Sequence, residues 1–211
     1  MLVGFLQFRP VRKNVNENLE KIEYLLQGIQ ADLIVLPELS NSGYLYSEPG
    51  ELAPFGEVND GSGPFLSTIQ SLADQIGGVI VSGFAEKSKE GLYNSAAAVG
   101  GGGVIAVYRK IHLFANEKKL FLPGNKGLRI FNHKGTPIGM MVCFDWIFPE
   151  VSRTLGLNGA RIIAHPSNLI LPFCQQAMTT RSLENGVFSI TTNRYGEEHL
   201  GSQSLTFTGC S

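Results

Sequence analysis

One segment, PIGMMVCFDWIFPE, constrains the fold more than any other part of this chain. Its apolar residues Ile138–Val142 predict a buried strand that stops abruptly at Cys143, and Phe144–Pro149 predicts a turn. Pro149 and Glu150 suit the start of a helix, because proline fits the first helical position and a carboxylate favours its positive end. The segment therefore places a cysteine on a sharp corner between a strand and a helix, with its side chain directed toward a cleft.

Two further apolar strands end on charged residues. Leu33–Glu38 (LIVLPE) ends on a carboxylate after a proline, and Val104–Leu113 (VIAVYRKIHL) carries Arg109 and Lys110 near its end. Strand ends are where layered α/β folds usually place their sites. A carboxylate in an apolar site has a raised pKa suited to a general base, and a nearby lysine ammonium favours a thiolate and neutralises an oxyanion. The alternative for Cys143 is a buried structural thiol.

Strand and helix patterns alternate along the chain. We expect strands at Leu2–Phe8, Leu33–Leu36, Gly78–Lys87, Leu92–Val99, Arg161–His165, Val187–Thr192 and Ser202–Thr208. We expect helices at Asn14–Gln30, Phe65–Ile76, Pro149–Asn158 and Phe173–Asn185. Ser40–Pro64 predicts a long loop, and Gly100–Gly103 predicts a hairpin turn, because no helix or GK[ST] motif follows it. The paired helices and more numerous strands favour two sheets packed face to face, with helices outside.

Several motifs in this order resemble the nitrilase or carbon–nitrogen hydrolase superfamily. They lie at Leu36–Glu38 (LPE), Val81–Val99, Tyr108–Phe114 (YRKIHLF), Phe121–Gly127, Cys143–Glu150 (CFDWIFPE) and Ala164–Phe188. The resemblance extends from residue 3 to about residue 207. It implies a four-layer αββα sandwich and a hydrolase that needs no metal or organic cofactor.

The same resemblance implies a set of catalytic residues. Carried over by motif, Glu38 is the base, Lys110 stabilises the oxyanion and Cys143 is the nucleophile. Many members use a second glutamate shortly after the lysine, and Glu117 is the matching residue; its alternative is a solvated loop charge. The main-chain N–H of Phe144 is the best candidate to share the oxyanion with Lys110.

Substrate choice follows from the residues after the cysteine. Amidase-like members that take carboxylate-bearing substrates often have arginine four positions after the cysteine, where this chain has Ile147. An apolar residue cannot neutralise a carboxylate, so we expect a small neutral aliphatic amide or nitrile. The block CFDWIFPE looks most like a branch of small microbial nitrilases that act on aliphatic nitriles, but amidases share the same triad, so the choice between the two substrates stays open. We expect Phe144, Trp146, Asn168 and Tyr44 to line the substrate pocket.

Three other polar residues have structural interpretations. His112 follows Lys110 by two positions and invites a Cys–His dyad, but we expect it to be structural or pocket-lining. His165 closes an apolar strand before a proline and is interpreted as a hydrogen-bonded core histidine. Asp145 is expected to bond the backbone of the turn after the cysteine.

Composition agrees with a single globular domain over residues 1–211. Of the 211 residues, 43% are hydrophobic and 17% are charged, and 17 basic against 18 acidic residues give a net charge of −1. No basic cluster or long apolar run suggests nucleic acid or a membrane as a partner. Three scattered cysteines form neither a disulfide framework nor a zinc pattern, so we expect a reduced, cytoplasmic protein.

The chain stops just after the strand expected at Ser202–Thr208, whereas family members usually continue with strands and a tail that packs on a neighbouring subunit. The resemblance implies a homodimer or higher homo-oligomer. The chain lacks the usual C-terminal extension, either because it is naturally short or because it is a fragment of a longer protein. Two alternatives to a hydrolase remain. An acyltransferase would use the same acyl-enzyme, and a non-catalytic interaction protein would retain only the fold.

Overall fold

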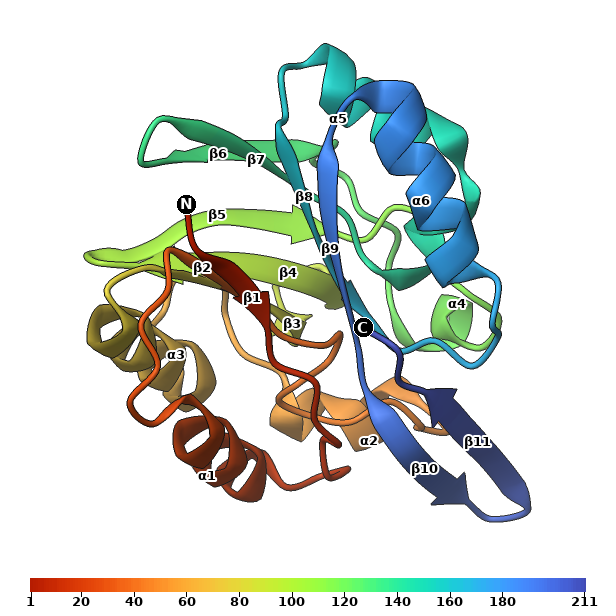
Figure 1. The fold of residues 1–211 in the computed structure, drawn as a ribbon. Helices are drawn as coiled ribbons and strands as arrows, with labels where there is room; N and C mark the ends of the chain where they lie inside the picture. Colours follow the sequence, from red (N-terminus) through yellow and green to blue (C-terminus); the bar gives the residue numbers. More distant parts are fainter.

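Two β-sheets face each other, and each is covered on its outer side by helices (Figure 1). The structure is a computed structural model that describes all residues from Met1 to Ser211. The first sheet has the order β1 (Val3–Phe5), β2 (Leu33–Val35), β3 (Val79–Lys87), β4 (Leu92–Gly100) and β5 (Gly103–Arg109). Its first three strands are parallel, and the last two pairings are antiparallel.

The second sheet carries the cysteine segment. Its order is β6 (Arg129–His133), β7 (Thr136–Met140), β8 (Ile162–Ser167) and β9 (Phe188–Asn193). Strands β7, β8 and β9 are parallel, and β6 is an antiparallel edge strand. A separate hairpin of β10 (Tyr195–Leu200) and β11 (Gln203–Thr208) projects from the end of β9 (Figure 1).

Four longer helices form the outer layers. Helices α1 (Val15–Leu26) and α3 (Pro64–Ile76) cover the first sheet, and α5 (Pro149–Leu157) and α6 (Cys174–Asn185) cover the second (Figure 1). Single-turn elements complete the fold: α2 (Pro49–Leu52), η1 (Ala53–Phe55), α4 (Glu117–Leu120) and η2 (Cys143–Ile147). The four-layer αββα sandwich expected from the sequence is confirmed.

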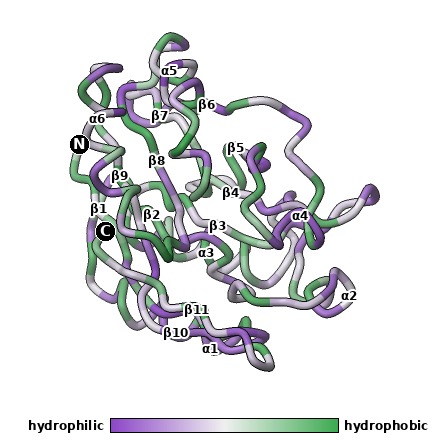
Figure 2. The backbone as a smooth tube through the Cα atoms, turned by 90° about the vertical axis from the view of Figure 1, so that its right-hand side faces the viewer, coloured by the Kyte–Doolittle hydropathy of each residue, from purple (hydrophilic) through white to green (hydrophobic).

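The first sheet is buried on both faces, and its period-2 alternation assigns each side chain to one of two cores. In β2, Leu33 and Val35 face the second sheet, whereas Ile34 packs toward helices α1 and α3. Helix α1 alternates between hydrophobic and hydrophilic residues along its length (Figure 2). Its buried apolar residues, Leu19, Ile22 and Leu26, belong to the helix-facing core.

Local signals explain where the helices begin. The Asn14 side chain accepts a hydrogen bond from the N–H of Glu17 and caps α1. At α3, the buried Glu57 carboxylate accepts from the N–H groups of Phe65 (2.6 Å) and Leu66 (3.0 Å), which satisfies donors that a helix start leaves unpaired. Helix α5 begins at Pro149, as predicted.

Most expected elements are confirmed, including the hairpin turn at the four glycines. The prediction of an unbroken loop at Ser40–Pro64 was wrong, because Pro49 and Pro64 start helices and η1 lies between them. The strand expected at Val104–Leu113 ends at Arg109, so Lys110 lies just beyond it. Strands β6 and β10 were not predicted.

Strand β3 passes unusually close to the end of β2, and only glycine permits it. A Cβ atom on Gly83 would lie 2.4 Å from the Cα of Glu38 and 2.8 Å from the N of Leu39. Because backbone atoms cannot move aside cheaply, we expect Gly83→Ala to lower the free energy of unfolding by about 1–3 kcal/mol in a urea titration. Gly50→Ala is the control, since its Cβ would meet nothing within 4 Å. Equal stability of the two variants would contradict this account.

Candidate active site

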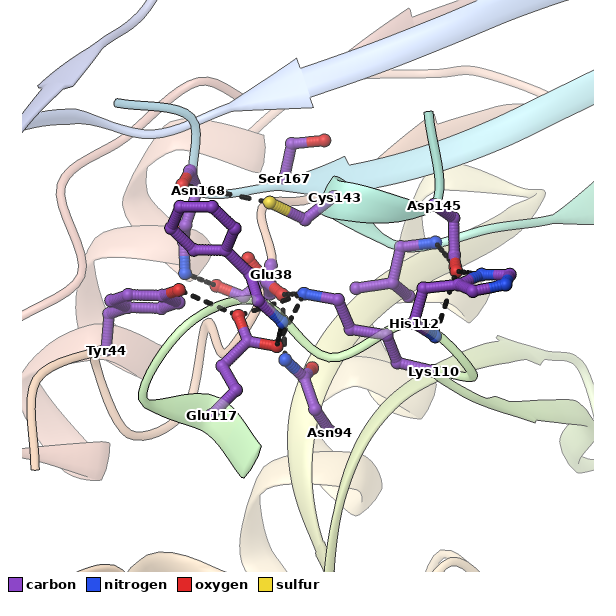
Figure 3. A network of polar contacts seen from close by, with 12 residues as sticks. Glu38, Tyr44, Asn94, Lys110, His112, Glu117, Cys143, Asp145, Ser167 and Asn168 are labelled. Carbon is purple, nitrogen blue, oxygen red and sulfur yellow. Dashed lines mark hydrogen bonds and ion pairs between the residues drawn. The ribbon is translucent and has the colours of Figure 1, made fainter. Parts of the chain in front are cut away.

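Three strand ends from both sheets converge at one edge of the sandwich. Glu38 follows β2, Lys110 follows β5 directly, and Cys143 follows β7 and opens the η2 turn. Figure 3 shows their side chains directed toward one another. All three are almost fully buried, with exposed fractions of 0%, 1% and 5%. Residues far apart in the sequence thus form one polar cluster inside an apolar core.

The Glu38 carboxylate has one paired and one unpaired oxygen. Its Oε1 accepts hydrogen bonds from Lys110 Nζ (2.6 Å) and Asn94 Nδ2 (2.7 Å). Its buried Oε2 has no hydrogen-bond partner. Burial raises the pKa of Glu38 more than the Lys110 ammonium lowers it. The carboxylate therefore has a free oxygen that favours gaining a proton.

Glu117 is a second carboxylate of the cluster. It lies on α4 and is only 3% exposed, so the alternative of a solvated loop charge was wrong. Its oxygens lie 2.9 Å and 2.8 Å from Lys110 Nζ. They also accept hydrogen bonds from the Tyr44 hydroxyl (2.7 Å) and the Phe114 N–H (3.1 Å). These contacts fix the carboxylate against the ammonium.

The Lys110 ammonium lies between the two carboxylates. Burial on its own would lower the pKa of Lys110. The charges of Glu117 and Glu38 together outweigh burial and raise this pKa well above its ordinary value. Lys110 is therefore a permanent cation with a fixed direction, suited to stabilising a negative charge that develops nearby.

Cys143 stands at a strained corner. Its φ of 43° lies in the left-handed region, which non-glycine residues rarely adopt. Its Sγ lies 3.8 Å from the main-chain oxygen of Asn168, whose Nδ2 donates to the main-chain oxygen of Glu38 at 3.0 Å. Asn168 thus links the thiol segment to the carboxylate segment.

Lys110 lowers the pKa of Cys143, as expected, but it does not decide the net shift. Burial, reinforced by the negative charge of Glu38, raises the pKa of Cys143 well above its ordinary value, and Lys110 only partly opposes this. The strand ends predicted a cation near the thiol but not how completely the sulfur is removed from water. Burial therefore favours the protonated form of this thiol.

Asp145 secures the turn that carries the cysteine. Its Oδ2 accepts from the Val142 N–H (2.9 Å) and the Tyr108 hydroxyl (2.8 Å), as the expected bond to the turn's backbone requires. Its Oδ1 lies 2.7 Å from His112 Nδ1. The His112 ring also stacks on Phe148 at 3.8 Å, so this histidine supports the turn and forms no dyad with the cysteine.

An apolar pocket opens beside the thiol. Phe144, Trp146 and Asn168 line it together with Cys143, whereas Tyr44 is directed to Glu117 instead. Nine of its ten lining residues are hydrophobic. The six lining residues not yet named are Phe114, Ile147, Leu169, Ile170, Leu171 and Phe173. No arrangement of three or more His, Cys, Asp or Glu side chains could hold a metal ion.

Tyr44 is held in place by the C-terminal hairpin. The Glu198 carboxylate on β10 accepts from the N–H groups of Tyr44 (3.1 Å) and Leu45 (2.8 Å), and it pairs with the buried Arg194. The Tyr44 ring also meets the edge of Phe207 on β11, with centroids 5.7 Å apart. The hairpin therefore contacts Tyr44, and Tyr44 in turn contacts Glu117 of the polar cluster.

Sequence reasoning gave no role to Asn94. It lies on β4, is completely buried, and donates to the same Glu38 oxygen as Lys110. A signal for it was present, because LYNSAAAV places one amide among apolar residues of a buried strand. A lone polar side chain in such a strand needs a buried partner.

Comparisons with known proteins agree with the fold and the motifs. The carbon–nitrogen hydrolase family profile matches residues 2–209. A Pyrococcus abyssi protein named nitrilase is 42% identical over 210 residues, 98% of this chain and 78% of that protein. A Pseudomonas protein named (R)-stereoselective amidase is 32% identical over 181 residues, 84% of this chain and 63% of that protein.

Solved structures of carbon–nitrogen hydrolases have the same fold as this chain. A carbon–nitrogen hydrolase from Helicobacter pylori aligns with a TM-score of 0.89 and 25% identity, covering 99% of this chain and 80% of that chain. A Nesterenkonia amidase has the same fold, with a TM-score of 0.79, 23% identity and coverage of 98% and 79%. The chain therefore belongs to the carbon–nitrogen hydrolase family and is an enzyme.

None of its helices has the length and apolar character needed to cross a membrane.

The raised thiol pKa has a measurable consequence. We expect alkylation of Cys143 by iodoacetamide to keep accelerating above about pH 9.5, one unit past the ordinary cysteine value of about 8.5. The reason is that the thiolate fraction still rises where a free thiol is already fully ionised. Mass spectrometry of the Cys143 peptide measures the rate, and free glutathione serves as the reference. A rate that levels off at the same pH as that of glutathione, or at a lower pH, would disprove the assignment.

Proposed function

We propose that this enzyme hydrolyses small neutral amides or nitriles through a covalent adduct on Cys143. The observation that carries the proposal is a buried thiol near Glu38, whose Oε2 has no hydrogen-bond partner. A nucleophile with a raised pKa and a base with a free acceptor oxygen are complementary. The names of the nitrilase and amidase relatives support the same class of reaction.

In the first half of the reaction, Glu38 Oε2 accepts the thiol proton as Sγ bonds to the substrate carbon. Negative charge moves to the carbonyl oxygen of an amide, where Lys110 Nζ and the Phe144 N–H stabilise it. Glu38 then returns the proton to the leaving nitrogen, and ammonia departs from a thioester. A nitrile gives a thioimidate first, which one added water converts to the same thioester with loss of ammonia.

In the second half, water replaces the sulfur. Glu38, again a carboxylate, removes a proton from the attacking water, and Lys110 again faces the oxyanion. Collapse of the tetrahedral intermediate breaks the carbon–sulfur bond, and the thiolate recovers its proton from Glu38. The product is a carboxylic acid, and the chain returns to its starting state without a cofactor taking part.

Glu117 has a supporting role in this scheme. It contacts Lys110 through both carboxylate oxygens and accepts a hydrogen bond from the Tyr44 hydroxyl. A long lysine side chain loses much conformational freedom when its ammonium is held from two sides. We therefore assign Glu117 to keeping Lys110 charged and directed at the oxyanion position, and Tyr44 to fixing Glu117.

The pocket supports a neutral, apolar substrate. Phe144, Trp146 and Ile147 contribute apolar surface next to Cys143, and Asn168 is the only polar side chain in the lining. A substrate carboxylate placed there would lose water without gaining a cation, which is costly. An aliphatic chain would instead gain free energy by leaving water.

Replacing the nucleophile tests the proposal directly. We expect Cys143→Ala to reduce ammonia release from a panel of aliphatic amides and nitriles by at least about 10³-fold, because no covalent adduct can form. Electrospray mass spectrometry of the unsubstituted enzyme should show an acyl adduct on Cys143. Cys210→Ala, which changes an exposed thiol, is the matched control. Full activity of Cys143→Ala, or no turnover of any panel member by the unsubstituted enzyme, would overturn the proposal.

Substrate charge is tested at Ile147. We expect Ile147→Arg to shift the ratio of kcat/KM toward an amide that carries a carboxylate by about tenfold, equal to about 1.4 kcal/mol. The new guanidinium would pair with a carboxylate that the native pocket leaves without a partner. Ile147→Met keeps the position apolar and serves as the control. An unchanged ratio in Ile147→Arg would show that this position does not face the substrate.

A further inference from the structure

His165 lies behind the cysteine turn and takes no part in the scheme above. It is the fourth residue of β8 and is completely buried, as a core histidine should be. Its Nε2 lies 2.9 Å from the main-chain oxygen of Cys143, and its Nδ1 lies 3.0 Å from the Thr191 hydroxyl on β9. Both ring nitrogens therefore have a partner.

These partners define where the ring proton lies. A carbonyl oxygen can only accept, so Nε2 carries the hydrogen and donates it to Cys143. Nδ1 of the neutral ring then accepts from the Thr191 hydroxyl. Burial lowers the pKa of His165 to about 4, so the ring stays neutral across the neutral pH range.

The main-chain oxygen of Cys143 and the N–H of Phe144 belong to the same peptide group. A trans peptide is planar, and its C=O and N–H point in opposite directions. The chain contains no cis peptide bond. Because His165 binds the oxygen from the core side, the Phe144 N–H points away from His165. Cys143 and Phe144 both line the apolar pocket on the other side of the turn from the buried histidine.

The Phe144 N–H is also free to receive a ligand. The first bond of the η2 turn runs from the Asp145 N–H to the Val142 oxygen at 3.1 Å. N–H groups that precede the first bond of a helical turn have no acceptor within that turn. Phe144 precedes Asp145, so its N–H is one of these groups.

We propose that His165 is a positioning residue, which orients the Phe144 N–H for the oxyanion by holding the opposite end of the peptide group. The inference rests on the proposed function. A φ of 43° at Cys143 shows that this corner is strained, and strained backbone persists only where its surroundings hold it. Without the His165 bond, the peptide group between Cys143 and Phe144 could rotate and withdraw the donor.

The test compares two reactions of the same sulfur in His165→Leu. Amide hydrolysis develops an oxyanion, whereas alkylation by iodoacetamide displaces iodide from a saturated carbon and develops none. We expect kcat for butyramide to fall by about 10- to 100-fold with little change in KM, because a donor to the transition state is misaligned. The alkylation rate of Cys143 should remain that of the unsubstituted enzyme.

His165→Gln is the matched control, because its amide N–H can still donate to the Cys143 oxygen, and kcat should largely recover. His165→Met, an adaptable apolar side chain, replaces the leucine variant if that variant does not fold. Unchanged kcat in the apolar variant would overturn the inference, as would a parallel fall in alkylation, which would mean that His165 places the sulfur. No turnover by the unsubstituted enzyme would instead overturn the proposed function and this inference with it.

Discussion

The pairing of the Lys110 ammonium with two buried carboxylates is the interaction on which the rest of the site depends. A buried charge without a partner costs several kcal/mol, so Glu38, Lys110 and Glu117 must come together when the sandwich closes. With both carboxylates ionised the cluster carries one excess negative charge. A thiolate at Cys143 would add a second in the same apolar surroundings, so burial and the charge of Glu38 raise the pKa of this thiol.

The corner that carries Cys143 is held from two directions. Asp145 binds the N–H of Val142 on one side, and His165 binds the oxygen of Cys143 on the other. Both anchors are buried and have further partners of their own, so the unusual backbone angle is built into the packing. The sulfur of Cys143 therefore belongs to a rigid element, and an apolar pocket lies beside it.

Much of this was predictable because apolar runs end sharply at Glu38, Lys110 and Cys143, and strand ends gather at one edge of a layered fold. The rest depended on contacts across the fold. Strand β6 (RIFNH) and strand β10 (YGEEHL) mix polar and apolar residues at an edge and in a hairpin, so neither has the clear pattern of a core strand. The thiol pKa depended on burial, which spacing along the chain does not measure.

The contact between Glu198 and the backbone of Tyr44 has a consequence for how the protein is made. These residues are 154 positions apart, so the contact closes one of the longest loops in the chain. Contacts of this kind form late, because their loop entropy must be overcome first. A nascent chain leaving the ribosome can assemble its first sheet early, yet the backbone N–H of Tyr44 has no carboxylate to bind until Glu198 on β10 has been synthesised.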